Sequence, residues 1–220
     1  MLGFMTRALS VTRAGARVIA VSTLPGIEAL PLREGGRFGS HDDHHHGERQ
    51  IDPHLWLDPH NARVIAHELA AALARLDPPN TARYQSNATA FERRIDALDK
   101  TLASRLAPLR ARPFLVFHDA YQYLEHRYGL SVAGAVTLGP EREPGARRLH
   151  DLRETAISLG VRCLFTEPQM RPAIARVLTE NTSIRIGELD PIGVAAPAGA
   201  DHYPAMLSRL AEQLIACLGD

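Results

Sequence analysis

The sequence has no Cys-x-x-Cys pair, no excess of charge of either sign and no long apolar run, and each absence excludes a class of protein. Its two cysteines, Cys163 and Cys217, stand alone, so a thiolate zinc site or a redox motif is not expected. The formal net charge is zero, which gives no basic field for nucleic acid or an anionic membrane. No apolar run reaches the roughly 20 residues that a helix needs to span a bilayer. Residues 1–20 contain scattered arginines and no apolar core, so we expect no signal peptide in this chain.

What remains is the composition of an ordinary globular protein. Of the 220 residues, 45% are hydrophobic and 23% are charged, and this length suffices for one large or two small domains. The two cysteines are either two buried thiols or one disulfide. A bridge between them would close a loop of about 54 residues and stabilise the fold by about 4 kcal/mol in the chain-entropy model.

Apolar periodicity predicts two consecutive helices in the first half of the chain. Asp58 as N-cap and Pro59 at the first helical position start one helix, which residues 77–79 end. A second helix runs from about Asn80 to Leu106, with apolar side chains at alternating spacings of four and three. At 1.5 Å per residue it is roughly 40 Å long, which favours a rigid strut between two lobes. Before these helices, residues 17–22 read as a single strand without a partner.

From Pro113 onward, strand and helix patterns alternate. The expected strands are Phe114–Phe117, Val132–Thr137, Cys163–Thr166 and Ile184–Leu189. The expected helices are Ala120–Arg127 with Asp119 as its cap, Gly145–Leu159, Arg171–Glu180 and His202–Leu218. Four such units predict an α/β fold in which a four-stranded parallel sheet carries helices on both faces.

The stretch 40–59 holds two different groups of metal-capable residues. His41, His44, His45 and His46 lie among acidic residues without apolar periodicity, a composition typical of a flexible loop that contacts metal. A solvated tract with no ligand is the alternative. The motif Asp-Pro-His-Leu-Trp-Leu-Asp-Pro at 52–59 is compact instead, and it sets His54 among large apolar neighbours. There the alternative to a ligand is a structural histidine.

Three expected strand ends also carry metal-capable groups. In open parallel sheets ligands bind beyond the carboxyl ends of the strands, where this chain has His118-Asp119, Glu167-Pro168 and Asp190-Pro191. Asp119 and Glu167 are equally suited to capping helices or loops, whereas His118 is a poor cap and a good ligand candidate. His54, His118 and Asp190 would together supply three ligands, and imidazole nitrogen favours zinc over manganese or magnesium.

Four motifs together resemble the zinc-binding proteins of bacterial zinc ABC transporters, the ZnuA-like, cluster A-I solute-binding proteins. The motifs are Asp-Pro-His-Leu-Trp-Leu-Asp-Pro at 52–59, Phe-His-Asp-Ala-Tyr at 117–121, Phe-Thr-Glu-Pro-Gln at 165–169 and Leu-Asp-Pro-Ile-Gly at 189–193, preceded by the His-rich loop. The resemblance implies two α/β lobes joined by a long helix, and zinc bound between them by His54, His118 and Asp190. It also implies a bridge between Cys163 and Cys217, a periplasmic location, a monomer, and delivery to a membrane permease without catalysis.

The chain departs from that family at its beginning. The family has a signal peptide and an amino-terminal lobe with a first zinc histidine, and we expect this chain to lack the signal peptide, that histidine and most of the lobe. The expected domains are the lobe remnant at 1–77, the linking helix at 78–107 and the carboxyl-terminal lobe at 108–220. The alternatives are a manganese-binding receptor and a metal-dependent hydrolase that uses the same site, although no general base stands at a fixed spacing such as that of a His-Glu-x-x-His helix.

Overall fold

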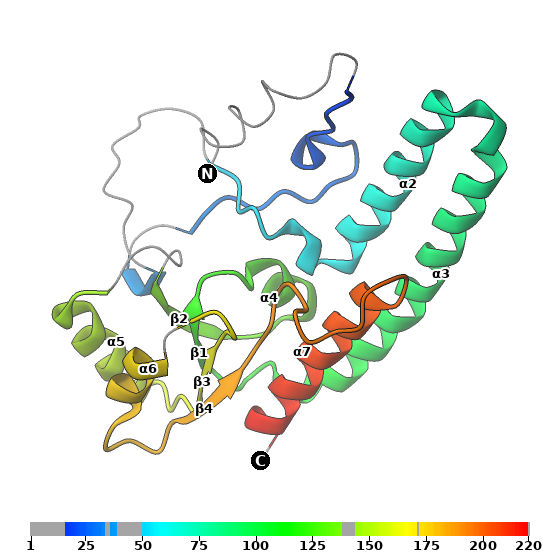
Figure 1. The fold of residues 1–220 in the computed structure, drawn as a ribbon. Helices are drawn as coiled ribbons and strands as arrows, with labels where there is room; N and C mark the ends of the chain where they lie inside the picture. The colour runs from blue at the N-terminus through cyan, green and yellow to red at the C-terminus, as the bar shows by residue number, and fades with distance from the viewer. Residues whose placement is uncertain (1–15, 34–35, 39–49, 138–143, 171, 220) are drawn as a thin grey trace.

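The fold centres on one parallel sheet near the carboxyl-terminal end of a long helical hairpin (Figure 1). The computed structural model describes residues 16–33, 36–38, 50–137, 144–170 and 172–219. The His-rich loop expected at 41–46 lies outside these ranges. Among the described helices, none combines the length and apolarity required to cross a membrane.

The sheet has four parallel strands in the order β2-β1-β3-β4. These are β1 (Phe114–His118), β2 (Val132–Thr137), β3 (Cys163–Thr166) and β4 (Arg185–Glu188). β1 and β3 are buried on both faces apart from partly exposed His118, as expected for a parallel sheet covered by helices. The predicted four-stranded parallel sheet is therefore confirmed, and the ends of β1 and β3 lie side by side.

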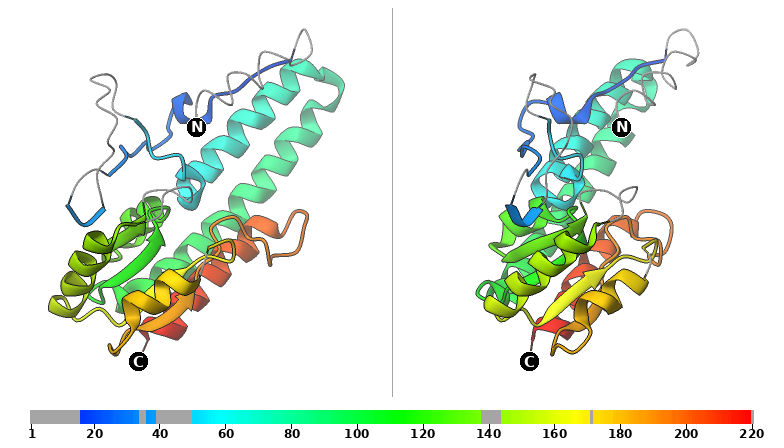
Figure 2. Two further views of the ribbon diagram at one scale, coloured as in Figure 1. Left: turned by 60° about the vertical axis from the view of Figure 1, so that its left-hand side comes forward. Right: turned by 90° about the vertical axis from the view of Figure 1, so that its left-hand side faces the viewer.

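Helices cover both faces of the sheet and divide the core into two clusters. Phe114, Val116 and Phe165 point to the side of α3, α4 and α7, while Leu115 and Leu164 point to the side of α5 and α6. This alternation follows from the two-residue period of a strand. Figure 1 shows α5 and α6 on one side of the sheet and α3 and α7 on the other, and in the right-hand view of Figure 2 the α5 and α6 side faces the viewer. The helices are α2 (Pro59–Leu76), α3 (Thr81–Leu106), α4 (Gln122–Tyr128), α5 (Ala146–Ser158), α6 (Pro172–Thr179) and α7 (His202–Leu218).

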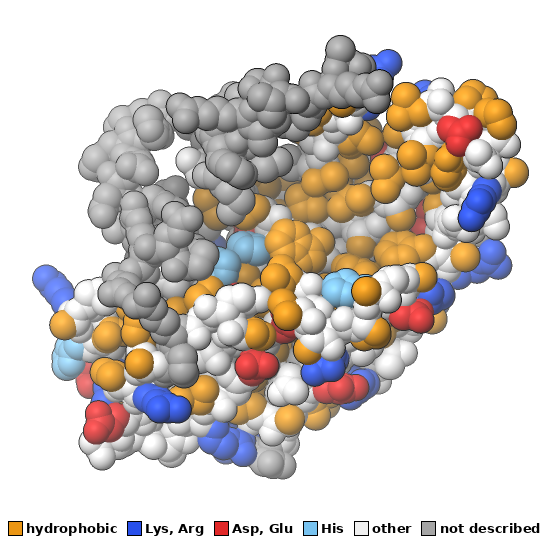
Figure 3. Space-filling model, viewed as in Figure 1, with side chains coloured by type: hydrophobic (Ala, Val, Ile, Leu, Met, Phe, Trp, Pro, Cys, Tyr) orange, Lys and Arg blue, Asp and Glu red, His pale blue; other side chains and the backbone are white. Residues whose placement is uncertain are grey.

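The α2–α3 hairpin projects beyond the sheet (Figures 1 and 2). The Asp58 carboxylate accepts a hydrogen bond from the His60 backbone N–H, and Pro59 occupies the first helical position, which confirms the predicted helix start. The carboxyl-terminal half of α3 packs against α7 through buried Leu102 and Leu106. In the face drawn in Figure 3, hydrophobic side chains gather along the hairpin and histidine atoms lie at the inner end of the hollow below it.

Two local expectations were wrong. Residues 17–22 do not form a strand: a short 3₁₀ turn spans Val21–Thr23. In the described structure, the isolated bridge of the region before α2 lies further along, where Pro31 pairs with Ile51 in the antiparallel sense. Asp119 does not cap α4, whose N-cap position is Tyr121. Its carboxylate binds the Arg33 guanidinium instead, and a buried ion pair of this kind is not visible in local sequence.

The expected bridge between Cys163 and Cys217 is present. It joins β3 in the sheet to the last turn of α7, and both residues are buried. The disulfide therefore fixes the carboxyl-terminal helix to the face of the sheet that it covers.

Candidate metal centre

Two imidazoles from distant parts of the chain meet beside the end of β1. The ring centroids of His54 and His118 lie 5.0 Å apart, with the ring planes at 75°. Both side chains are largely buried, with 13% and 12% of their surface exposed. The structure thus brings together the two histidines that the sequence singled out.

His54 is held by the short segment in which it lies. Asp52 is buried, and its Oδ1 lies 2.7 Å from His54 Nδ1 while also accepting the His54 backbone N–H at 2.9 Å. The Trp56 ring packs 5.4 Å from the His54 ring, and its Nε1 donates to the Pro191 carbonyl. Buried Asn61 donates to the Leu55 carbonyl from the first turn of α2. These contacts leave Nε2 as the nitrogen of His54 that is available to a ligand.

His118 is the last residue of β1, and a carboxylate from the residue directly after the adjacent strand β3 lies beside its ring. Glu167 Oε1 lies 3.3 Å from His118 Nδ1. The Nδ1 atom is buried, and no hydrogen-bond partner reaches it within the described structure. A buried imidazole nitrogen left in this state favours a further ligand or a shift of Glu167.

Tyr121 keeps Glu167 in place. Its hydroxyl donates to the Leu189 carbonyl at 3.2 Å and to Glu167 Oε1 at 3.4 Å. Burial, followed by the nearby carboxylates of Glu167 and Asp190, raises the pKa of Tyr121 well above its usual range. The hydroxyl therefore stays neutral and remains a donor at every physiological pH.

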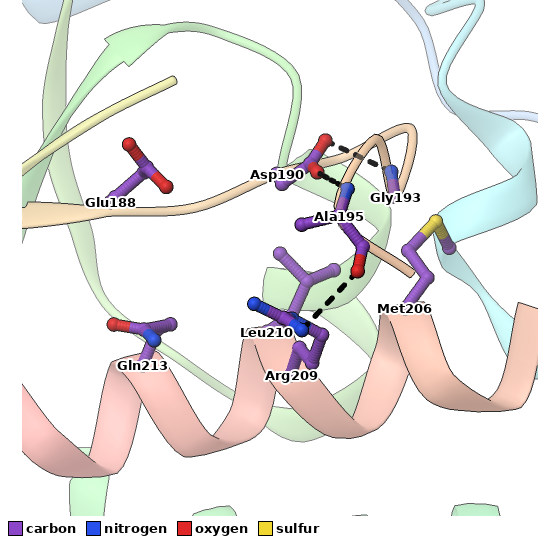
Figure 4. A pocket seen from close by; sticks show the side chains of 8 residues that line it. All are labelled: Glu188, Asp190, Gly193, Ala195, Met206, Arg209, Leu210 and Gln213. Atoms are coloured by element: carbon purple, nitrogen blue, oxygen red, sulfur yellow. Dashed lines mark hydrogen bonds between the residues drawn. The ribbon is translucent and has the colours of Figure 1, made fainter. Parts of the chain in front are cut away.

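Asp190 is turned toward its own loop. Its carboxylate accepts hydrogen bonds from the backbone amides of Gly193, Ile192 and Ala195, and it lines a small pocket against α7 with residues such as Met206 and Leu210 (Figure 4). Within the described ranges, no three His, Cys, Asp or Glu side chains are grouped so that they could hold a metal ion. The structure therefore brings two of the three expected ligands together, His54 and His118. The Asp190 carboxylate instead binds the backbone amides of its own loop.

The geometry of the imidazole pair suits a tetrahedral ion. Two imidazoles that bind one zinc at about 2.0 Å, with tetrahedral angles, have ring centroids about 5 Å apart. A carboxylate also lies beside Nδ1 of each ring, Asp52 at 2.7 Å from His54 and Glu167 at 3.3 Å from His118, as is usual behind metal-binding histidines. His60 takes no part in this pair, because its Nε2 lies 2.9 Å from the Gly26 carbonyl.

Sequence reasoning missed two carboxylates next to the imidazoles. Asp52 stands two residues before His54, the spacing at which an Asp side chain bonds its own backbone, and this was the available signal. Glu167 was placed at the correct strand end, yet it was interpreted as a cap. Its proximity to His118 follows from the pairing of β1 with β3.

Comparison with known proteins assigns the family. The family profile described as "ZnuA: Zinc-uptake complex component A periplasmic" matches residues 2–217. The chain is 36% identical over 247 aligned positions to the high-affinity zinc uptake system protein ZnuA of Brucella abortus, covering 98% of this chain and 73% of that protein. A crystal structure of ZnuA superposes with a TM-score of 0.79 at 26% identity, over 99% of this chain and 78% of that one. A Zn(II)-bound AdcAII variant from Streptococcus pneumoniae gives 0.73 at 25%, over 94% and 76%. This chain belongs to the ZnuA family of zinc-uptake components.

Proposed function

We propose that this protein captures zinc with His54 and His118 and delivers it, in the periplasm, to the permease of a zinc ABC transporter. The observation that carries the proposal is the meeting of the two imidazoles at 5.0 Å between centroids. The relatives named as high-affinity zinc uptake proteins support the cargo, and the family description supports the location. The protein acts as a binding component, without catalysis.

Two imidazoles leave a tetrahedral zinc with two further positions. Water fills one of them in this proposal, and Asp190 is the protein ligand proposed for the other. Asp190 would have to release part of its hydrogen bonding to Gly193 and its neighbours, which makes it the weakest of the three ligands. Manganese is the less favourable cargo, because it prefers oxygen donors to imidazole nitrogen.

The His-rich loop is proposed to act before the centre. His41, His44, His45 and His46 would bind zinc weakly and raise its concentration near His54. Support comes from the described residues on either side, because the Leu32 backbone N–H bonds the Gln50 carbonyl and the Asp52 N–H bonds the Leu30 carbonyl. This pairing brings the two ends of the loop segment together close to His54.

The long helix is proposed to hold the parts of the protein rigidly. α3 has 26 residues, and its two halves pack against α2 and α7. In this proposal the domains at 1–77 and 108–220 keep their relative position during capture, and the helix between them does not act as a hinge. Zinc binding would then leave the overall dimensions of the molecule unchanged in solution scattering.

A chelator competition titration with zinc tests the proposal. His54→Ala and His118→Ala should each weaken binding by at least tenfold, and the double variant should lose the tight site altogether. His150→Ala, an exposed histidine on α5, is the matched control and should bind as the wild type does. The fluorescence of Trp56, the single tryptophan, should report zinc binding directly, since its ring lies against that of His54. A tight site that survives in the double variant would disprove the assignment.

Two further variants separate the auxiliary groups. Asp190→Asn should weaken zinc binding less than either histidine variant if the carboxylate is a ligand, and not at all if water takes that position. Replacing the four loop histidines by serine should remove only weakly bound zinc. If that replacement abolished the tight site, the loop would belong to the centre itself.

A further inference from the structure

We propose that Asp52 and Glu167 are the positioning residues of this centre, each acting on Nδ1 of one imidazole so that both rings present Nε2 to the shared ion. The inference rests on the proposed function, because it names the residues that prepare the same site. Neither carboxylate is among the expected ligands, and both are buried next to the histidine that they contact.

The case for Asp52 comes from a single oxygen atom that accepts two donors from one residue. Oδ1 takes the His54 backbone N–H at 2.9 Å, which fixes the carboxylate relative to the chain. The same oxygen lies 2.7 Å from Nδ1, and an ionised carboxylate can only accept, so Nδ1 must carry the proton. The neutral ring then has its lone pair on Nε2, the atom that a zinc ion needs.

Asp52 is itself anchored through both of its backbone polar groups. Its backbone N–H donates to the Leu30 carbonyl, and its own carbonyl accepts the Tyr123 hydroxyl at 3.0 Å. Tyr123 is buried in α4 and also accepts the Leu30 backbone N–H. The carboxylate is therefore held at a fixed place before any ion arrives, which is the property required of a positioning group.

Glu167 stands in the same relation to His118, with one difference. Its Oε1 lies 3.3 Å from Nδ1, yet the two atoms are not aligned as a hydrogen bond and Nδ1 is without a partner in the described structure. Tyr121 holds the carboxylate in this position from the other side. A small rotation of the Glu167 side chain completes the bond, and we assign that rotation to the zinc-bound state.

The two pairs also balance charge. A divalent ion bound by two neutral imidazoles brings two positive charges into a buried place, and one ionised carboxylate behind each ring offsets them. Carboxylates in this position also raise the basicity of the imidazoles that bind the metal. The pairing therefore contributes to affinity without occupying a coordination position, which leaves those positions to water and Asp190.

The first test is independent of zinc. With ¹⁵N-labelled histidine in the zinc-free protein at about pH 8, the neutral form of His54 should show protonated Nδ1 and free Nε2. Asp52→Ala should abolish this preference. Asp52→Asn should keep it, because the amide oxygen can still accept from both donors, while the negative charge is lost. A His54 with its proton on Nε2 in the wild type would overturn the assignment of Asp52.

The second test uses zinc affinity. Asp52→Ala and Glu167→Ala should each weaken zinc binding by about 10–100-fold, with Asp52→Asn between the wild type and Asp52→Ala. Glu154→Gln, an exposed carboxylate on α5, should have no effect. Zinc-dependent ¹⁵N shifts should appear at Nε2 of both histidines, and a shift at Nδ1 of His118 would overturn the role of Glu167. If the wild type bound no zinc, the proposed function would fail, and the zinc-free tautomer measurement would still decide the role of Asp52.

Discussion

At the scale of single residues, Asn61 helps to fix the segment that carries His54. It is fully buried in the first turn of α2, accepts the Glu28 backbone N–H at 2.8 Å, and donates to the carbonyls of Glu28 and Leu55. Asn61 therefore joins two loops that have no regular hydrogen-bond ladder between them. In its absence the two Glu28 backbone groups would lose this partner, whereas the Leu55 carbonyl would keep the Asp58 backbone N–H.

We predict that Asn61→Ala lowers the free energy of unfolding by about 2–3 kcal/mol, the usual effect of leaving buried backbone groups unpaired. It should also weaken zinc binding, since Leu55 follows His54 directly. Urea unfolding and the zinc titration measure the two effects. Asn87→Ala, an exposed asparagine in α3, is the control and should change stability by less than about 0.5 kcal/mol. Equal unfolding midpoints for the two variants would contradict the prediction.

Single residues also show where sequence reasoning succeeds and fails. The Asp58-Pro59 helix start depends on backbone groups within three residues, so local sequence was enough to predict it. Asp119 has the same chemistry as Asp58, yet it binds Arg33 from far away along the chain, and no local pattern contains that contact. His54 and His118 could be chosen because one lies in a distinctive motif and the other at a strand end.

At the scale of secondary-structure elements, α3 and α4 are joined by an ionic contact. The Asp99 carboxylate of α3 accepts from Arg127 Nε at 3.2 Å and from the Tyr128 hydroxyl at 3.0 Å, both in α4. Burial raises the pKa of Asp99, but the bonds from Arg127 and Tyr128 outweigh this, and the pKa of Asp99 lies below its usual range. The ionised form is therefore favoured by folding.

This shift predicts a pH-dependent stability. The contribution of Asp99 should be fully present above the pKa of an unfolded Asp, about 3.9, and should be lost as the pH falls through the lower folded value. Asp99→Asn should consequently destabilise the protein at about pH 7 by about 1–3 kcal/mol, and the difference from wild type should shrink toward about pH 3. Urea titrations at several pH values measure it. Asp96→Asn, at an exposed ion pair with Arg63, is the control and should show little difference at any pH. A constant difference across this range would refute the argument.

The elements of the carboxyl-terminal half could be predicted because each has a strong internal pattern. The expected bounds of His202–Leu218, Val132–Thr137 and Cys163–Thr166 were reproduced, and the other strands and helices differ from the expected bounds by a few residues. The strand predicted at residues 17–22 is absent because a short apolar run forms a strand only when a neighbouring strand offers an edge for hydrogen bonding. In the described structure the backbone of that segment bonds within its own 3₁₀ turn, and Val21 packs against the core.

The disulfide also acts between elements. Cys163 in β3 and Cys217 in α7 are 54 residues apart, and the chain-entropy model assigns about 4 kcal/mol to closing such a loop. Cys163→Ala with Cys217→Ala should lower the unfolding midpoint in urea, and reductant should lower that of the wild type only. A reductant effect of equal size on the double variant would show that the stabilisation has another origin.

At the scale of the whole molecule, the site depends on how the amino-terminal segment, the described residues 16–33, 36–38 and 50–58 that precede α2, docks on the sheet. His54 belongs to that segment and His118 to the sheet, so their 5.0 Å separation is a tertiary property. The strand-end rule and the family resemblance predicted the meeting of these two residues. They could not predict the contacts that secure it, because those contacts join residues with no fixed spacing.

Arg33 makes the most extensive of these contacts. Its guanidinium binds both oxygens of Asp119, next to His118, and its Nη1 donates to Glu125 at 2.5 Å in α4. The same group stacks 3.9 Å above the Phe38 ring. Arg33 is mostly buried, as are both acidic partners. Removing it would leave two buried carboxylates without the cation that compensates them.

We therefore predict that Arg33→Met destabilises docking of the amino-terminal segment by about 3–5 kcal/mol, the usual result of breaking a buried ion pair from one side. Because the sheet keeps its own core, hydrogen exchange should accelerate in residues 24–33 and 50–58 much more than in β1 and β3. Zinc affinity should fall in proportion to the undocked fraction, and the tautomer of His54 should persist. Arg94→Met, which removes an exposed contact with Asp201, is the matched control and should alter neither property. Uniform acceleration of exchange across the sheet would show that Arg33 supports the whole fold rather than the docking of the segment that carries His54.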